Sequence, residues 1–213
     1  MILFGIILAA DKNIIDGTNS FLLNLGVRPI LAGLAREMER SKVRQWSIVL
    51  GYDFDVHRRV IENVSIRPVT DPEWQNGFAS QVRTGLHEMP PQTDGFIILP
   101  GNLPFFGKTE MNLLVDALEA EKGYIIIPTS NGKIFPFPLF HRKLLGEVLN
   151  RIDEGTLKSI INEHVADTYE VEIKNPYKLL QVVDKASYLK AKDIAFKSEQ
   201  KEEQANPQME IPE

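Results

Sequence analysis

The loop after the first apolar run of the chain has the position of a phosphate-binding loop but not its usual charge. Residues 2–10 are apolar, and Asp11, Lys12 and Asp16 follow them, together with a single loop glycine, Gly17. Loops that wrap phosphates after a first strand are normally rich in Gly and carry Lys or Arg, because backbone N–H groups and cations both attract the anion. Two aspartates and one lysine leave two alternatives, a working phosphate loop or a loop that keeps only its shape.

Strand-length apolar runs alternate with segments of helical periodicity along most of the chain. The predicted strands are 2–9, 46–51, 65–69, 95–101, 124–130, 169–173 and 179–184. The predicted helices are 29–40, 53–63, 77–89, 109–122, 140–152, 154–165 and 187–196, with Thr109 as the N-cap of the fourth. This alternation predicts a three-layer α/β domain with a mostly parallel sheet.

Parallel sheets of this kind bind ligands beyond the carboxyl ends of their strands. The loops expected there are 9–20, 51–54, 70–80, 100–108 and 128–138. The four histidines are scattered, and none is spaced from another as a metal-ligand pair would be. The sequence also contains no Ser-His-Asp order and no P-loop motif.

Composition excludes several classes of protein. The 213 residues are 43% apolar and include no cysteine, so disulfides and thiolate metal sites are excluded. No apolar run approaches the roughly 20 residues of a membrane span, and we expect a cytoplasmic protein. Residues 193–213 hold six acidic residues and two lysines of a chain with net charge −5. We expect a domain over 1–192, a disordered acidic tail over 193–213 and no nucleic-acid partner.

Five blocks resemble the molybdopterin nucleotidyltransferase family, and more narrowly its branch that transfers CMP to the molybdenum cofactor. The first, LAADKNIIDGTNSFLLNL, is similar to the family's L-A-A-G-x-S-x-R-M-G-x-x-K-x-L-L-x-L, and the second is DPEWQNGFASQVRTGL. The others are GFIILPGNLPFF, NGKIFPFPLFHRKLLGEVL and LLQVVDKASYL. The matching positions in the first three blocks are Leu8, Ala9, Ala10, Gly17, Leu22, Leu23, Leu25, Asp71, Pro72, Trp74, Gly77, Ser80, Gly85, Leu86, Gly101 and Pro104.

The resemblance implies a nucleotidyl transfer that needs Mg²⁺, with CTP or GTP as one substrate and a molybdopterin-type small molecule as the other. It implies catalytic and metal-binding roles for Asn102 and Asp184, and Arg83, one helical turn after Ser80, is added as a catalytic candidate because it is the best cation left near the cleft. Nucleotide binding would fall to the first loop, to Ser80 and to the strand end at Gly101. The first-loop positions are Leu8, Ala9, Ala10, Asp11, Lys12 and Gly17.

The departures from the family pattern fall on its charged positions. Asp11 stands at the family's loop glycine, Ile15 at its arginine and Ser20 at its lysine. Asn102 replaces the aspartate that holds the metal, and Val182 replaces the first aspartate of the last block, where Asp184 remains. Phosphoryl chemistry depends on cations that hold and spread negative charge, and removing one such group commonly costs about 3–4 kcal/mol of barrier.

Two functions follow as alternatives. In the first, the chain is an active nucleotidyltransferase in which Lys108, Lys133 or Arg83 replaces the missing cations. In the second, it is a non-catalytic relative that binds a nucleotide, a cofactor or a protein partner through the same cleft. The charge of the first loop and the neutral Asn102 favour the second.

Overall fold

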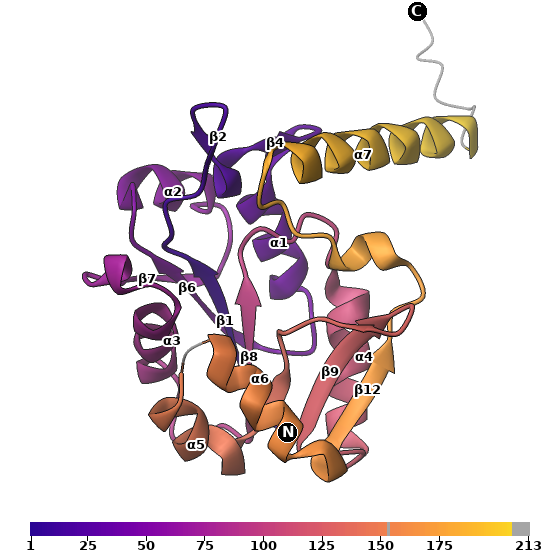
Figure 1. Ribbon diagram of the computed structural model, residues 1–213. Helices are drawn as coiled ribbons and strands as arrows, with labels where there is room; N and C mark the ends of the chain where they lie inside the picture. Colours follow the sequence, from indigo (N-terminus) through magenta and orange to yellow (C-terminus); the bar gives the residue numbers. More distant parts are fainter. Residues whose placement is uncertain (153, 206–213) are drawn as a thin grey trace, which may run out of the picture.

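The first apolar run forms the central strand β1 (Leu3–Ala9), and all seven of its residues are buried. It pairs in parallel with β6 along one edge and with β8 along the other. Helices cover both faces of the sheet around it (Figure 1). A parallel strand covered on both faces needs a continuous apolar sequence, which is what β1 has. The computed structural model describes residues 1–152 and 154–205.

The main sheet is mixed and mostly parallel, as the sequence predicts. Its order over the described residues is β10–β9–β11–β8–β1–β6–β7, and β12 pairs with β9 beside this path. The strands that share the direction of β1 are β6 (Gln45–Leu50), β7 (Arg67–Thr70), β8 (Gly95–Pro100), β9 (Ile125–Ser130) and β12 (Thr168–Glu172). The antiparallel strands are β10 (Lys133–Ile134) and β11 (Leu139–His141).

Helices cover the sheet on two sides and give the three layers. One side carries α1 (Ile30–Glu39), α2 (Phe54–Val60) and α4 (Lys108–Glu119). The other carries α3 (Phe78–His87), α5 (Leu145–Asn150) and α6 (Glu154–Glu163). Each side has its own apolar cluster, because alternate residues of β1 point to opposite faces of the sheet.

Helix α3 lies unusually close to β1. A Cβ placed on Gly85 would lie 2.4 Å from Cγ2 of Ile6, so only glycine allows this approach. The approach brings the N-terminal part of α3 against the loop that follows β1, where Gln81 meets Asp11.

The segment between β1 and α1 forms two short hairpins and a 3₁₀ turn. The first hairpin joins β2 (Ile14–Ile15) and β3 (Thr18–Asn19), and the second joins β4 (Asn24–Leu25) and β5 (Arg28–Pro29). Asp16 and Gly17 have φ of 48° and 84°, the positive values that a tight two-residue hairpin turn requires. The 3₁₀ turns are η1 (Ser20–Leu22), η2 (Trp74–Asn76), η3 (Arg142–Leu144), η4 (Val165–Asp167) and η5 (Pro176–Leu179).

The N-cap of α4 and the last predicted strand differ from expectation. Helix α4 begins at Lys108, and its N-cap is Gly107 rather than Thr109, because the Glu110 carboxylate accepts the Gly107 N–H at 3.0 Å. Residues 180–184, expected to complete a strand, form no strand and instead run past the loop that contains Asn102, to which Val182 is hydrogen-bonded. The short strand β11 was not expected.

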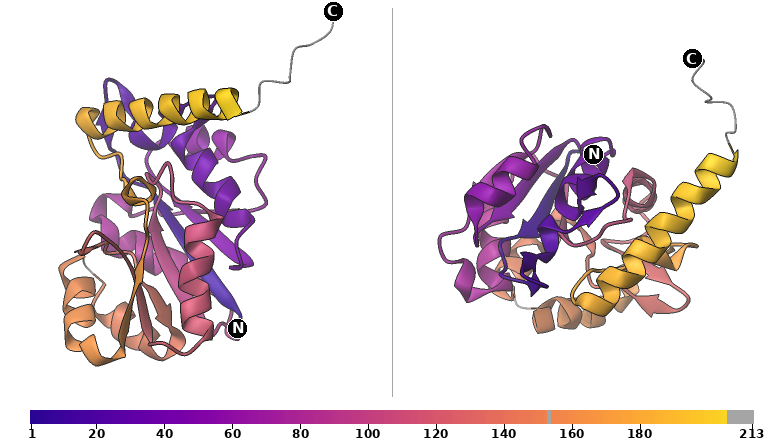
Figure 2. Two further views of the ribbon diagram at one scale, coloured as in Figure 1. Left: turned by 90° about the vertical axis from the view of Figure 1, so that its right-hand side faces the viewer. Right: turned by 90° about the horizontal axis from the view of Figure 1, so that it is seen from above.

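The last helix, α7 (Lys185–Ala205), is longer than predicted and lies across one end of the molecule (Figure 2). It packs on the second hairpin, where the Tyr188 hydroxyl donates to the Asn24 carbonyl at 3.0 Å. Helix continues through residues 193–205, which the sequence predicts as disordered, since Lys, Glu, Gln and Ala there are good helix formers. The rest of the predicted tail, 206–213, lies outside the described residues. Among the helices of residues 1–152 and 154–205, none is long and apolar enough to cross a membrane.

Candidate functional site

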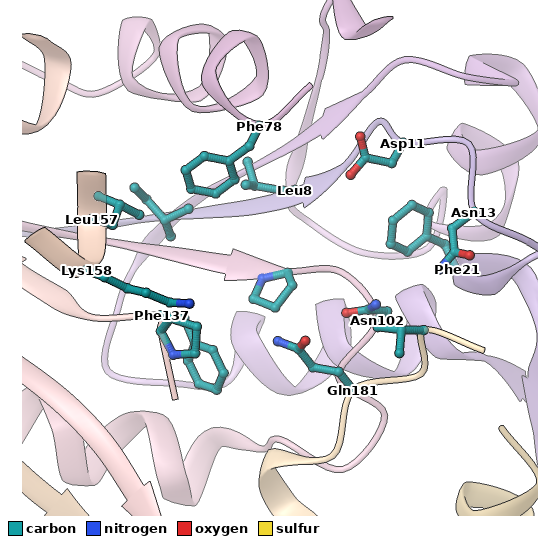
Figure 3. Close-up of a pocket in the computed structure, with 14 residues that line it drawn as sticks. Leu8, Asp11, Asn13, Phe21, Phe78, Asn102, Phe137, Leu157, Lys158 and Gln181 are labelled. Carbon is teal, nitrogen blue, oxygen red and sulfur yellow. The ribbon is translucent and has the colours of Figure 1, made fainter. Parts of the chain in front are cut away.

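A cavity of about 380 Å³ lies at the carboxyl ends of β1 and β8 (Figure 3). This is where ligands bind in open α/β sheets, and the size lies within the roughly 300–1,000 Å³ of small-molecule sites. Its apolar lining is Leu8, Phe21, Phe78, Ile98, Pro100, Pro136, Phe137, Leu157 and Val183. Its polar lining is Asp11, Asn13, Asn102, Lys158 and Gln181. One acidic and one basic side chain therefore face a cavity whose other lining residues are apolar side chains and three neutral amides.

Asp11 is fixed at the rim of the cavity by its neighbours. The Gln81 side chain accepts the Ala10 N–H at 3.2 Å, so its amide N–H₂ points to Asp11 and donates to Oδ1 at 2.7 Å. The Asn19 amide donates to the Asp11 carbonyl at 2.9 Å. These contacts place a carboxylate at the expected ligand loop and leave it in the role of hydrogen-bond acceptor.

The two loop positions at which the resemblance leads us to expect cations, 15 and 20, are part of the packing. Ile15 is 5% exposed and packs in an apolar cluster with Leu23 and Ile30. Ser20 is fully buried, and its N–H donates to the Asn13 carbonyl at 2.8 Å. Both side chains are therefore buried in the loop and supply no charge to the cavity.

Asn102 joins the cavity to the C-terminal segment of the chain. Its side-chain N–H₂ donates to the Val182 carbonyl at 3.1 Å, and its own carbonyl accepts the Val182 N–H at 2.9 Å. This pair of bonds holds the segment that brings Gln181 and Val183 to the cavity wall. The other polar side-chain atom, Oδ1, is buried and has no hydrogen-bond partner among residues 1–152 and 154–205. An aspartate could not make the first of these bonds, since a carboxylate has no N–H to donate.

Asp184, the other expected metal ligand, caps helix α7. The backbone N–H of Ser187 donates to Asp184 Oδ1 at 2.7 Å, and the Ser187 hydroxyl donates to the same oxygen at 2.7 Å. These bonds hold the pKa of the Asp184 carboxyl below its usual range. Val183, and not Asp184, lines the cavity.

The residues present do not fit a divalent metal ion. Mg²⁺ favours several oxygen ligands with charged carboxylates among them. The cavity offers a single carboxylate, Asp11, besides the neutral amide oxygens of Asn13, Asn102 and Gln181, while the carboxylate of Asp184 caps its helix. No group of three or more His, Asp or Glu side chains suited to a metal occurs in the described part of the chain.

The remaining predicted site residues divide between the cavity and its surroundings. Leu8 lines the cavity. Ala9 and Ala10 are buried and lead into the loop that contains Asp11. At Gly101, an added Cβ would lie 2.9 Å from the carbonyl oxygen of Leu8. Gly17 lies at the tip of the first hairpin.

Three other predicted residues lie away from the cavity, and two of them contact protein groups. The ammonium of Lys12 lies 5.2 Å from the centre of the Tyr52 ring. Ser80 donates to Oδ1 of the buried Asp71 at 2.8 Å. Arg83 is exposed on α3 and does not line the cavity.

The cation at the cavity is Lys158 of α6, which the sequence did not single out. Neither Lys108 nor Lys133, the other expected substitutes for the missing cations, is among the cavity-lining residues of the described chain. Gln81, Phe78, Phe137 and Gln181 were missed as well. The helical pattern of 77–89 could have indicated Phe78 and Gln81, but Lys158 and Gln181 come from segments that only the tertiary fold brings to this edge.

The aspartate of the second family block has a packing role here. Asp71 is 1% exposed and accepts the Ser80 hydroxyl at 2.8 Å and the Glu73 N–H at 3.0 Å. Its own N–H donates to the Leu50 carbonyl at 2.8 Å. The contacts fix the start of α3, and with it Phe78 and Gln81, against the sheet.

Sequence comparison now identifies the family. The profile described as MobA-like NTP transferase domain matches residues 5–168. The chain belongs to this family. No curated protein sequence matches it.

Solved structures with low sequence identity share its fold. A nucleotidyl transferase from Methanothermobacter thermautotrophicus has a TM-score of 0.80 at 15% identity, with 92% of this chain and 99% of that chain covered. Rv0371c from Mycobacterium tuberculosis H37Rv has a TM-score of 0.79 at 17% identity, covering 90% and 97%, and has also been solved in complex with manganese. CMP:2-keto-3-deoxy-manno-octonic acid synthetase, solved in complex with CTP, has a TM-score of 0.71 at 10% identity, covering 93% and 100%.

Proposed function

We propose that this member of the MobA-like NTP transferase family uses the family cleft to bind a nucleotide-like ligand without Mg²⁺ and does not carry out nucleotidyl transfer. The observation that carries the proposal is the Asp11 carboxylate, which Gln81 holds at the rim of the cavity where the family's phosphate loop lies. A carboxylate at this place repels a triphosphate, and neither Ile15 nor Ser20 supplies a compensating charge.

The cavity nevertheless suits the nucleoside part of such a ligand. Aromatic rings of Phe21, Phe78 and Phe137 and the proline at 136 line it, and a few polar groups face it. Apolar walls with a small number of oriented polar groups are what bind uncharged rings in small-molecule sites. Loss of the cations removes the attraction for the phosphates and leaves the attraction for the base.

Calorimetry tests the proposal. Purified protein is titrated with CTP and GTP, each with and without Mg²⁺, and with the nucleosides cytidine and guanosine. We expect at least one nucleoside to bind as tightly as its triphosphate, with no requirement for Mg²⁺. Tight binding of a triphosphate only with Mg²⁺, or pyrophosphate release on adding a phosphorylated pterin cofactor, would overturn the proposal.

A matched pair of variants isolates the charge of the loop. Asp11→Asn keeps the shape of the side chain and removes its charge, and we expect it to tighten CTP binding several-fold. Asp16→Asn makes the same change at the exposed hairpin tip, where Asp16 pairs with Lys185, and serves as the control. Equal effects of the two changes would mean that Asp11 does not face the phosphates.

A second candidate function rests on Lys158. Its presence at the cavity gives the chain one cation from outside the first loop. In this alternative the protein is an active Mg²⁺-dependent transferase, and CMP or GMP passes to a molybdopterin-type cofactor. The pyrophosphate assay distinguishes the two, since Lys158→Ala would abolish transfer in the active enzyme.

A further inference from the structure

We infer that the exposed face of helix α7 is an interface on which α7 of a second copy of this chain packs in antiparallel orientation. The interface lies at the end of the molecule that carries α7 and the β4–β5 hairpin. It goes beyond the proposed function and does not depend on it. Exposed apolar side chains and the order of charges along the helix both point to this partner.

Two large apolar side chains are exposed on one face of α7. Leu189 is 55% exposed and Phe196 is 59% exposed. The two residues are seven positions apart, which is close to two helical turns, so their side chains lie on the same face. The face that packs on the protein is a different one, because Tyr188 and Ala191 lie in the apolar cluster with Ile15. Helix α7 thus has a second apolar face that is largely open to solvent in the described part of the chain.

The neighbouring β4–β5 hairpin extends this apolar surface. Val27 lies in the turn of the hairpin and is 92% exposed. A groove of about 340 Å³ separates the hairpin from α7, and its lining includes Leu25, Ala195 and Phe196. Apolar side chains that gather on a surface mark an interaction site. A protruding side chain beside a groove suits a two-fold pair, in which each contact between the copies occurs twice.

The length of α7 also calls for a further contact. Its ion pair and hydrogen bond with the first loop come from its N-terminal part, where Lys185 lies 3.1 Å from Asp16 and Tyr188 donates to the Asn24 carbonyl. The helix nevertheless continues for 21 residues, and Figure 2 shows its C-terminal part reaching past the other elements. Helices obtain most of their stability from packing of an apolar face. A second helix packed on Leu189 and Phe196 would supply it.

The order of charges along α7 identifies the partner and its direction. After the N-cap Asp184, residues 185–192 carry three lysines and no acidic residue, whereas residues 193–205 carry four acidic residues and two lysines. This order opposes the helix dipole, which favours basic side chains near the C-terminus and acidic ones near the N-terminus. In an antiparallel pair, the lysine-rich part of each helix lies beside the acidic part of the other. A second copy of the chain carries this complement by symmetry, and a parallel pair would place like charges together.

Sedimentation equilibrium of the full chain, from low to high micromolar concentration, tests the interface. We expect a monomer–dimer equilibrium that Leu189→Ser weakens about tenfold or more, because a leucine side chain buried between the copies is lost. Leu113→Ser is the matched control, since Leu113 is 45% exposed on α4 and lies outside this face. It should leave the dimer unchanged. Thermal unfolding of both variants checks that neither change alters the fold.

Single cysteines report the direction of pairing, because the chain contains none of its own. With Leu189 of one helix packed on Phe196 of the other, Lys192 of each copy lies next to the two-fold axis. In the same register the two copies of Gln200 lie about 22 Å apart along the helices, whereas a disulfide needs Cα atoms within about 7 Å. Lys192→Cys should therefore give a disulfide-linked dimer on oxidation, and Gln200→Cys should not.

Each contrary outcome overturns a stated part of the inference. A monomer at every concentration overturns the interface and leaves this face to residues 206–213 or to a different protein. A dimer that Leu189→Ser and Leu113→Ser weaken equally places the interface elsewhere on the molecule. Crosslinking of Gln200→Cys as well as Lys192→Cys, or of neither, overturns the antiparallel arrangement.

Discussion

Asn102, where the resemblance leads us to expect a metal-holding aspartate, joins two distant segments of the fold. Its side chain donates to the Val182 carbonyl and its backbone accepts the Val182 N–H, so the two segments are held together from positions 80 residues apart. The amide is needed for this, because a carboxylate would face a carbonyl oxygen without a proton between them. The neutral side chain therefore has a structural reason here, independent of any reaction.

Restoring the family's carboxylate should cost stability and should not create a metal site. For Asn102→Asp we expect a loss of about 1–3 kcal/mol in the free energy of unfolding, because a buried carbonyl loses its donor and gains a facing charge. We expect the loss to be the same with and without Mg²⁺. Chemical denaturation in both buffers measures it, and Asn112→Asp on the partly exposed face of α4 is a control for the substitution itself. A variant that Mg²⁺ restores to the stability of the native protein would show that the metal site is intact.

At the scale of elements, the site depends on short segments packed under one another. Helix α2 packs on the turn η1, where His57 contacts Phe21 with ring centres 5.8 Å apart, and Phe21 lines the cavity. His57 is fully buried, and burial lowers its pKa below the usual value even though the Asp53 carbonyl lies 3.0 Å from Nδ1. Because burial disfavours the charged imidazolium, binding of a proton to His57 destabilises the folded state at the place where α2 packs on η1.

The free energy of unfolding should decrease as the pH falls below about 6.5, because the pKa of His57 is lower in the folded chain than in the unfolded chain. In the unfolded chain His57 binds a proton near pH 6.5, while in the folded chain it does so only at lower pH. Below about pH 6.5 the unfolded state binds more protons, so the free energy of unfolding decreases as the pH falls and is fully regained above that value. Urea denaturation between pH 5 and pH 8 measures the slope.

Two variants assign the slope to a single histidine. His57→Gln keeps a donor for Asp53 but cannot ionise, so it should flatten the dependence in this range. His87→Gln, on the exposed face of α3, should leave the dependence unchanged. A slope that survives His57→Gln would assign the effect to other groups.

The elements that sequence periodicity predicts are specified by their own apolar patterns, whereas the segment that it misassigns is specified by tertiary contacts. Strands such as β1 and β8 and the helices α1 and α3 have long apolar patterns that fix them locally, and they are found where expected. The segment 180–184 has a strand-like composition, but its polar backbone groups pair with the Asn102 loop instead of a sheet. Only tertiary contacts decide this, and periodicity does not include them.

The same distinction explains which residues of the cavity could be predicted from the sequence. Asp11 and Asn102 could be placed at the cavity because they follow β1 and β8 directly, and the ends of adjacent parallel strands meet. Lys158 and Gln181 come from α6 and the C-terminal segment, whose positions depend on how the whole chain closes. The sequence could indicate that the first loop lacks cations, but not which side chains replace them at the cavity.

For the whole molecule, the C-terminal segment and the first loop share one apolar cluster. Val182 is fully buried and packs with Ile15, Leu23 and Ile30, although more than 150 residues separate it from that loop. Positions 15 and 182, at which the resemblance leads us to expect charged residues, thus meet inside the protein. The loss of charge at both is mutually consistent, because a charged group at either would be buried against an apolar neighbour.

Restoring charge to this cluster should unfold the cleft rather than reactivate it. Val182→Asp places an unpaired carboxylate in a fully buried position, and we expect a loss of about 3 kcal/mol or more in the free energy of unfolding. The loss should shrink as the pH falls and the carboxyl becomes protonated. Val183→Asp is the matched control, since Val183 is 50% exposed and its charge can stay in water, so that change should cost well under 1 kcal/mol. If the two variants were equally stable, the C-terminal segment would not be packed on the first loop, and the cavity that both segments line would have to be open to solvent on that side.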